Sequence, residues 1–272
     1  MLAAEAGAAM VIGVDHSAIA DTAKEVVKDN RLEGVVTILR GRVQEVELPE
    51  GIAEVDIILS EWMGLSLLYK NSLTAVLFAR DKWLAPNGLV FPDRCRLFLA
   101  GVETLRWGER RFGFWEHVHG FRMDSIARAS RREVEVVALG AGPVVTTPCL
   151  VKELDLMTCG KADLGVSSDF YMKVTRKDYV TALIAYFDVT FTHGRERVVL
   201  ATGPEDPATH WKQVLFHLQE AFTAEEGDTI EGTIVMKEAS GGHGDVEAQV
   251  EVRMYDVEDN LRRSEETSYV LG

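Results

Sequence analysis

Residues 60–71 read "SEWMGLSLLYKN" and lie between two segments whose hydrophobic patterns differ. Before them, "AEVDIILSE" (53–61) is an apolar run typical of a strand that is buried on both faces. After them, "SLTAVLFARDKWL" (72–84) carries apolar residues at helical spacing, and "PNG" (86–88) ends the pattern. The stretch therefore connects the carboxyl end of a strand to a helix, and it places Glu61 where the strand ends.

The same alternation of strand and helix fills the sequence before this stretch. "AAMVIGVD" (8–15) and "VVTILR" (35–40) predict two further strands, and "HSAIADTAKEVVKDN" (16–30) predicts a helix between them. Strands that alternate with helices build βαβ units and therefore a parallel sheet. We predict a Rossmann-like α/β domain over residues 1–92.

The pattern changes after about residue 94. Strand-like runs such as "CLVKELDL" (149–156) and "DYVTALIAYFDVTFT" (178–192) predominate, separated by Gly, Asp and Pro. This pattern predicts an antiparallel β-barrel domain over residues 93–272. Within it, residues 105–130 are aromatic and basic with helical spacing, so we expect a helical insertion there.

The composition limits the class of protein and of partner. The chain has 272 residues, of which 47% are hydrophobic and 26% charged, as in ordinary soluble proteins. Its net charge of −14 argues against nucleic acid or an anionic membrane as the main partner. The three cysteines lack metal-ligand spacing, which predicts a reducing compartment and no metal site. Without a signal-like start or an apolar run of membrane-spanning length, we expect a cytoplasmic protein.

Three polar residues stand at the ends of the predicted parallel strands, where such sheets bind ligands. They are Asp15, Gln44 and Glu61. An acid after the first strand commonly binds ribose hydroxyls, although Asp15 fits equally well as a cap of the following helix. No G-x-G turn precedes residues 8–15, so the backbone amides that such a turn offers to a ligand are missing from this sequence.

Three segments resemble the protein arginine methyltransferase family, specifically its type I, dimethylating branch. They are "VDIILSEWMG", "LLYKNSLTAVLFARDKWLAPNGLVFPDR" and "THWKQVLF", and the resemblance extends from residue 1 to about residue 255. It implies a domain that binds S-adenosylmethionine (AdoMet), a β-barrel substrate domain, and a dimerisation arm, which would be residues 105–130. The aromatic residues expected to make the contacts of the arm are Trp107, Phe114, Trp115 and Phe121.

In this family two glutamates hold the substrate guanidinium by paired hydrogen bonds beside the AdoMet sulfonium. The resemblance places Glu61 at the first glutamate, whereas Lys70 stands at the second. Exchanging attraction for repulsion at about 4 Å costs at most on the order of 8 kcal/mol at an effective dielectric of 20. Lys70 can alternatively extend into water, but the second carboxylate is lost in either case.

Four further residues are assigned by the resemblance. Asp15 stands at the ribose-binding acid, where the family usually has the longer Glu, and Gln44 stands at the acid that receives the adenine amino group. His210 and Trp211 keep the "THW" pattern of the family. We expect His210 to be a retained structural residue with Lys70 as a neighbour.

These departures lead to the hypothesis of a catalytically inactive paralogue. Such a pseudoenzyme would bind no cofactor alone and would act through the arm as regulatory subunit of an active, AdoMet-binding arginine methyltransferase, like the prozymes of kinetoplastid parasites. The alternative is an active type I enzyme with an additional segment before residue 1. A third possibility is a binding module whose acidic surface recruits Arg-rich proteins.

Overall fold

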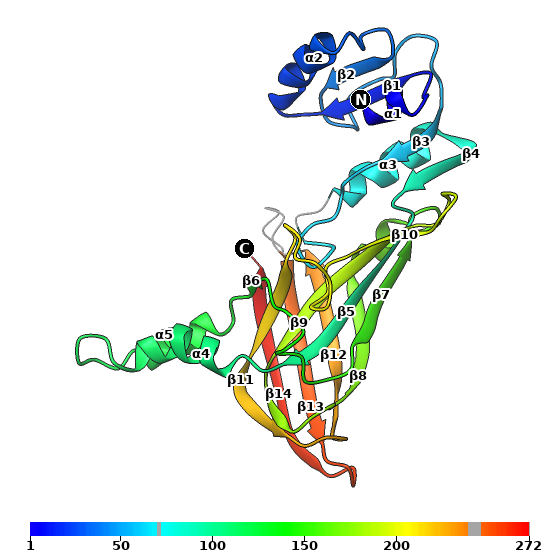
Figure 1. Ribbon diagram of the computed structural model, residues 1–272. Helices are drawn as coiled ribbons and strands as arrows, with labels where there is room; N and C mark the ends of the chain where they lie inside the picture. Colours follow the sequence, from blue (N-terminus) through cyan, green and yellow to red (C-terminus); the bar gives the residue numbers. More distant parts are fainter. Residues whose placement is uncertain (70–71, 239–245, 272) are drawn as a thin grey trace. The chain divides into compact units, whose positions relative to one another are not determined.

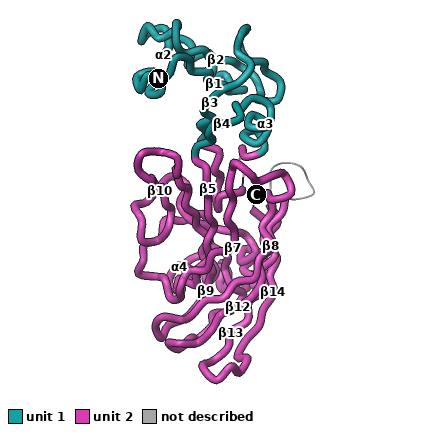
Figure 2. Tube along the Cα trace, turned by 90° about the vertical axis from the view of Figure 1, so that its right-hand side faces the viewer, with its two compact units in different colours: residues 1–60, 74–91 teal, residues 61–73, 92–272 magenta. Residues whose placement is uncertain are grey.

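The structure is a computed structural model that describes residues 1–69, 72–238 and 246–271. Its two compact units, coloured separately in Figure 2, are residues 1–60 with 74–91 and residues 61–73 with 92–272. Residues 61–73, which the sequence analysis assigned to the first domain, thus group with the second unit. Among the described helices, none has the length and apolar character needed to span a membrane.

The first unit alternates helices and strands, as the hydrophobic periodicity predicts. Its elements are α1 (Leu2–Glu5), β1 (Val11–Asp15), α2 (Ile19–Asp29), β2 (Val36–Arg40), β3 (Val55–Leu59), α3 (Leu73–Trp83, whose first residue belongs to the second unit) and β4 (Leu84–Phe91). β1 pairs with β2 and β3 with β4, both in parallel (Figure 1). The Rossmann-like class predicted for this part of the chain is therefore confirmed.

β3 differs from its predicted environment. We expected this apolar strand to be buried on both faces, yet Ile57 is 57% exposed and Leu59 is 70% exposed. Burial on both faces requires a strand on each side and cover above and below. The only strand that pairs with β3 in the described part of the chain is β4, so this condition is not met.

The second unit is built from antiparallel strands. Its elements are β5 (Arg94–Val102), α4 (Leu105–Phe112), η1 (Gly113–Glu116), α5 (Asp124–Ser130), β6 (Glu135–Val137), β7 (Cys149–Asp155), η2 (Lys161–Leu164), β8 (Val166–Lys173), β9 (Asp178–Phe191), β10 (Val198–Ala201), β11 (Gln213–Ala224), β12 (Thr229–Glu238), β13 (Val246–Tyr255) and β14 (Leu261–Leu271). One sheet has the order β6-β11-β9-β5-β7 with β10 on β9, and the other has the order β14-β13-β12-β8. β7 lies beside β8 and β11 beside β14, which makes the unit barrel-like as predicted (Figure 1).

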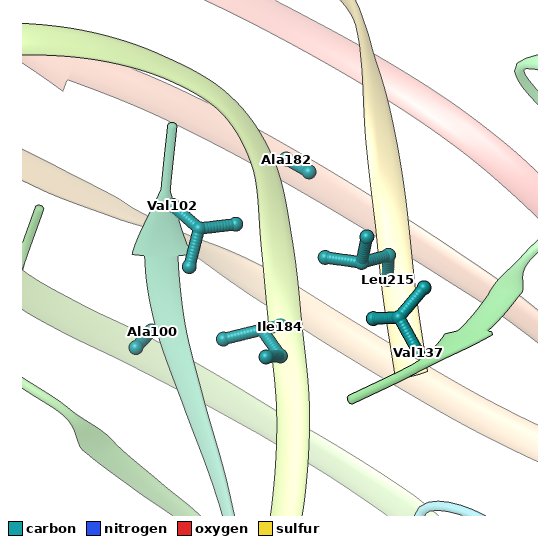
Figure 3. Close-up of a cluster of buried hydrophobic side chains, with 6 residues drawn as sticks. All are labelled: Ala100, Val102, Val137, Ala182, Ile184 and Leu215. Atoms are coloured by element: carbon teal, nitrogen blue, oxygen red, sulfur yellow. The ribbon is translucent and has the colours of Figure 1, made fainter. Parts of the chain in front are cut away.

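The core of the larger sheet follows the two-residue period of its strands. Ala100 and Val102 of β5 and Ala182 and Ile184 of β9 point to the same side, because alternate residues of a strand share a face (Figure 3). Leu215 and Val137 complete this cluster, and all of its side chains are almost fully buried. The alternation seen in the sequence therefore decides which side of the sheet faces the interior.

We predict that replacing Gly232 by alanine destabilises the barrel-like unit. Gly232 lies in the middle of β12, where an added Cβ would be 1.8 Å from the backbone oxygen of Glu251 in β13 and 2.8 Å from the ring of Phe170 in β8. Because a paired backbone cannot move aside without breaking the ladder, we expect a loss of about 2–3 kcal/mol, measured by thermal unfolding. Gly140→Ala is the matched control, since nothing lies within 4 Å of its added Cβ. Equal melting temperatures for the two variants would contradict the prediction.

The helical insertion lies where the sequence analysis placed it. α4, η1 and α5 follow β5, precede β6, and extend away from the strands (Figure 1). Phe112 at the base is buried, whereas Phe114 and Phe121 are 60% and 70% exposed. We call residues 105–130 the arm. Phe112 packs within its own unit, whereas Phe114 and Phe121 present apolar surface to solvent.

Candidate functional site

Glu61 presents its carboxylate to solvent in the second unit. It follows the last residue of β3 by two positions in the sequence, and its side chain is 65% exposed. Its Oε1 lies 3.3 Å from Nε2 of His210, although 149 positions separate the two residues. The His210 ring lies over that of Trp211, with ring centroids 3.9 Å apart. Glu61 is thus an accessible carboxylate held beside an imidazole.

Trp211 attaches this pair to the strands beneath it. The indole is buried, and its Nε1 donates a hydrogen bond of 3.0 Å to the backbone oxygen of Met63. The same ring packs edge-on against Phe187 of β9 at a centroid distance of 5.8 Å. These contacts join the segment that carries Glu61 to the segment that carries His210. The sequence analysis did not predict the contacts of Met63 and Phe187 with Trp211, because a contact between residues so far apart in the chain leaves no local signal.

The segment that follows Glu61 is a tight, buried turn. Gly64 and Leu67 exchange backbone hydrogen bonds of 2.9 and 3.1 Å. Ser66 and Leu67 adopt positive φ angles of 42° and 69°, which are uncommon for residues with a Cβ. Trp62, Ser66 and Leu67 are all nearly inaccessible to solvent. Glu61 therefore stands at the accessible end of a segment whose other described side chains are largely packed away.

Two buried polar atoms in this turn have no hydrogen-bond partner among the described residues. Within the described residues, neither Nε1 of Trp62 nor Oγ of Ser66 has one. Unpaired buried donors and left-handed residues raise the energy of a segment and are often found near functional sites. This strain depends on backbone angles and long-range packing, so the sequence alone contained no sign of it.

Asp15 and Gln44 lie in the first unit, at or shortly after the carboxyl ends of two neighbouring parallel strands. Asp15 ends β1, and Gln44 follows β2 in an exposed turn. Oδ1 of Asp15 accepts hydrogen bonds from the backbone N–H and the hydroxyl of Ser17, at 2.7 and 2.6 Å. These bonds, first of all the one from the hydroxyl, lower the pKa of the Asp15 carboxyl. Oδ2 has no hydrogen bond within the part of the chain that the structure describes, so it can still accept one from a ligand.

His210 has an acidic neighbour in the described part of the chain. The expected neighbour, Lys70, lies outside the described residues. Among the residues described, the acid beside the imidazole is Glu61. The contact could not be read from the sequence, because it depends on where the segment before β11 folds back onto the turn after Glu61.

These features together define a class of protein. A parallel α/β unit carries an acid and an amide at its strand ends, and a barrel-like unit with a helical arm carries an accessible carboxylate. This is the architecture of a Rossmann-like methyltransferase with an appended β-barrel. A family model described as "Arginine methyltransferase oligomerization subdomain" matches residues 93–257, which is more than half of the chain. The chain belongs to the protein arginine N-methyltransferase family.

Its curated relatives agree with this assignment. Protein arginine N-methyltransferase 8-B of Danio rerio is 40% identical over 252 residues, which cover 93% of this chain and 60% of the relative. Protein arginine N-methyltransferase 1 of Caenorhabditis elegans is 39% identical over 92% of this chain and 72% of the relative. The chain thus spans between three fifths and three quarters of the length of these relatives.

Solved structures show the same fold. The "Trypanosoma brucei PRMT1 enzyme-prozyme heterotetrameric complex with AdoHcy" matches with a TM-score of 0.94 and 34% identity, covering 100% of this chain and 84% of that chain. Arabidopsis thaliana protein arginine methyltransferase 10, in an open conformation, matches with a TM-score of 0.88 and 26% identity, covering 99% and 84%.

The expectation that this chain is not an enzyme is wrong. Several relatives that are 38–42% identical to it are named as protein arginine N-methyltransferases, and nothing in the described structure indicates inactivity. The expectation depended partly on a glycine-rich turn missing before residue 8, but the relatives extend well beyond the region that matches, so this absence carries no weight. It depended also on Lys70, which is a single substitution at a position that the structure does not describe.

Proposed function

We propose that this chain is part of an AdoMet-dependent protein arginine N-methyltransferase of the type I, dimethylating class. The observation that carries the proposal is the similarity to named methyltransferases over more than nine tenths of the chain. The position of Glu61 supports it, because an exposed carboxylate on a buried, anchored turn can accept a guanidinium without rearrangement.

Glu61 would bind the substrate arginine. Its two oxygens can accept paired N–H hydrogen bonds from a guanidinium, which orients the planar group and offsets its charge. His210 holds one of these oxygens at 3.3 Å in the structure, so the imidazole can restrict the carboxylate to one orientation. Trp211 in turn restricts His210 by packing against its ring. The net charge of −14 favours the approach of an Arg-rich protein.

Asp15 and Gln44 would bind the cofactor. The free Oδ2 of Asp15 suits a ribose hydroxyl, and the exposed amide oxygen of Gln44 can accept a hydrogen bond from an adenine amino group. When bound, AdoMet supplies the methyl group. The proposed roles of these residues are binding and orientation only.

The arm would join this chain to a second methyltransferase subunit. Exposed Phe114 and Phe121, with the nearby arginines of the arm, form a surface rich in the residue types that dominate protein interfaces. The match to the Trypanosoma brucei heterotetramer supports a second candidate function, in which the partner is a different, related methyltransferase subunit.

The test is methylation of an Arg-rich peptide with AdoMet, followed by mass spectrometry. The protein is assayed alone and after co-expression with a related methyltransferase subunit. We expect mono- and dimethylarginine, and no product when the arginines are replaced by lysine. Product only in the co-purified complex would favour the mixed assembly. If neither sample methylates a peptide that a related enzyme modifies under the same conditions, the proposal is refuted.

A further inference from the structure

A buried histidine lies beneath the base of the arm. His217 of β11 is only 2% exposed, and its Nε2 lies 2.9 Å from Oε2 of Glu135. Glu135 is the first residue of β6, the strand that directly follows the arm. The pair therefore connects the central part of the larger sheet to the point where the chain returns from the arm.

The carboxylate of Glu135 also contacts the first helix of the arm. Nε1 of Trp107 donates a hydrogen bond of 3.0 Å to Oε2, and Nη1 of Arg111 lies 3.4 Å from Oε1. Trp107 and Arg111 are four residues apart on α4, so both face the same side of that helix. One carboxylate thus joins α4, β6 and β11, and each of its oxygens is in use.

Apolar and charged groups enclose the imidazole from the other sides. Phe112 packs edge-on against the His217 ring at a centroid distance of 5.0 Å, and the guanidinium of Arg131 lies 4.2 Å from the centroid of Phe112. Tyr269 of β14 donates a hydrogen bond of 2.7 Å to the backbone oxygen of His217. Movement of the arm base would disturb these contacts as well as those of Glu135.

We propose that Glu135 is a positioning residue that fixes the direction in which the arm leaves the barrel-like unit, and that His217 makes this attachment sensitive to pH. The inference rests on the proposed function only in that the arm joins subunits. A neutral imidazole can donate its Nε2 proton to Glu135. A second proton would place positive charge near two guanidinium groups.

The charged groups around His217 decide the direction of the pH effect. Those that face it are Glu135 of β6, Arg111 of α4 and Arg131 after α5, while β14 contributes Glu265 near Arg131 and the phenol of Tyr269. Burial lowers the pKa of His217 below its usual value, against the opposing effect of Glu135. Because the unfolded chain binds the proton more readily, this histidine favours the folded state above its usual pKa of about 6.5. The contribution is lost as pH falls below that value and through the lower pKa of the folded state.

The test uses the whole chain and two measurements, the exchange of backbone amide hydrogens over residues 105–130 and the dissociation constant of its oligomer from sedimentation. Glu135→Gln replaces one acceptor oxygen by an amide donor, so we expect exchange at least about tenfold faster and a dissociation constant raised about tenfold. Glu133→Gln is the matched control: Glu133 contacts the same Arg111 at 3.5 Å but is exposed. It should change neither value by more than about twofold.

Two further variants, Trp107→Phe and His217→Gln, keep the proposal testable if Glu135→Gln does not fold. Trp107→Phe removes the indole N–H and retains a ring, and it should also accelerate exchange in the arm. In the wild-type protein, exchange in the arm, corrected for its intrinsic pH dependence, should rise as the pH falls below about 6.5. His217→Gln, which retains an N–H donor, should abolish this rise, although the arm keeps the exposed His117 and His119.

The proposal is overturned if Trp107→Phe and Glu135→Gln leave exchange in the arm at the wild-type rate. It is equally overturned if Glu133→Gln has the same effect as Glu135→Gln, because loss of any carboxylate beside Arg111, even an exposed one, would then loosen the arm. Persistence of the pH response in His217→Gln would refute the role of the histidine. A protein that is monomeric or does not methylate peptides would contradict the proposed function, yet the exchange measurements would still test this inference.

Discussion

Replacing Glu61 by glutamine is expected to lower kcat/KM for an Arg-rich peptide by about a hundredfold to a thousandfold. A unit charge pair at about 4 Å contributes roughly 4 kcal/mol at an effective dielectric of 20, and each 1.4 kcal/mol of transition-state stabilisation corresponds to about tenfold in rate. Glutamine keeps the size of the side chain but removes the charge and turns one acceptor into a donor, which opposes the N–H groups of a guanidinium. The measurement is steady-state methylation at several peptide concentrations.

The control for this variant is Glu54→Gln, which removes an exposed carboxylate shortly before β3. It should retain the wild-type rate within about twofold. Both variants should melt at the wild-type temperature. Glu61 is largely exposed, and the ion pair that the structure describes for it is with His210, which is also exposed. A Glu61→Gln protein with undiminished kcat/KM would show that the guanidinium binds elsewhere.

Replacing both Trp115 and Phe121 by alanine is expected to weaken the oligomer by at least about a hundredfold. Phe121 is among the most exposed apolar residues of the described chain, and the Trp115 ring packs against the exposed Phe114 at a centroid distance of 5.2 Å. Aromatic residues in the centre of an interface commonly contribute about 2 kcal/mol or more each, and losses of this size add up when the residues do not share a partner. Sedimentation velocity over a concentration series measures the change.

The fold of the double variant should remain intact, because neither Trp115 nor Phe121 is a buried side chain, whereas Phe112 of the same arm is. Tyr179→Ala is the matched control, since it removes an exposed aromatic residue of β9 outside the arm. An unchanged oligomer in the double variant would show that these two aromatic residues are not the contact surface. If methylation falls in parallel with the oligomer, the assembly is required for activity.

Local patterns predicted most of the individual elements. The strands β1 and β2, the helix α2 between them and the arm lie within or close to the predicted ranges, because burial of one face imposes a period of two or 3.6 residues on the sequence itself. The barrel-like second unit could be predicted from the density of alternating runs. The inactive pseudoenzyme was predicted wrongly, because one substitution and a missing motif were given more weight than the similarity of the remaining chain.

The sequence by itself determined the order and type of most of the elements, the family, and the presence of Glu61 just after a strand. Only the tertiary structure decided what surrounds that carboxylate. His210 lies 3.3 Å from it, Trp211 donates a hydrogen bond to the backbone of Met63, and the turn that follows contains two residues with left-handed backbone angles. It also decided that the side chains of Trp107 and His217 both contact the carboxylate of Glu135. The periodicity of a strand records which face of it is buried, but it does not record which distant strand becomes its neighbour, and these contacts join residues 28 to 149 positions apart.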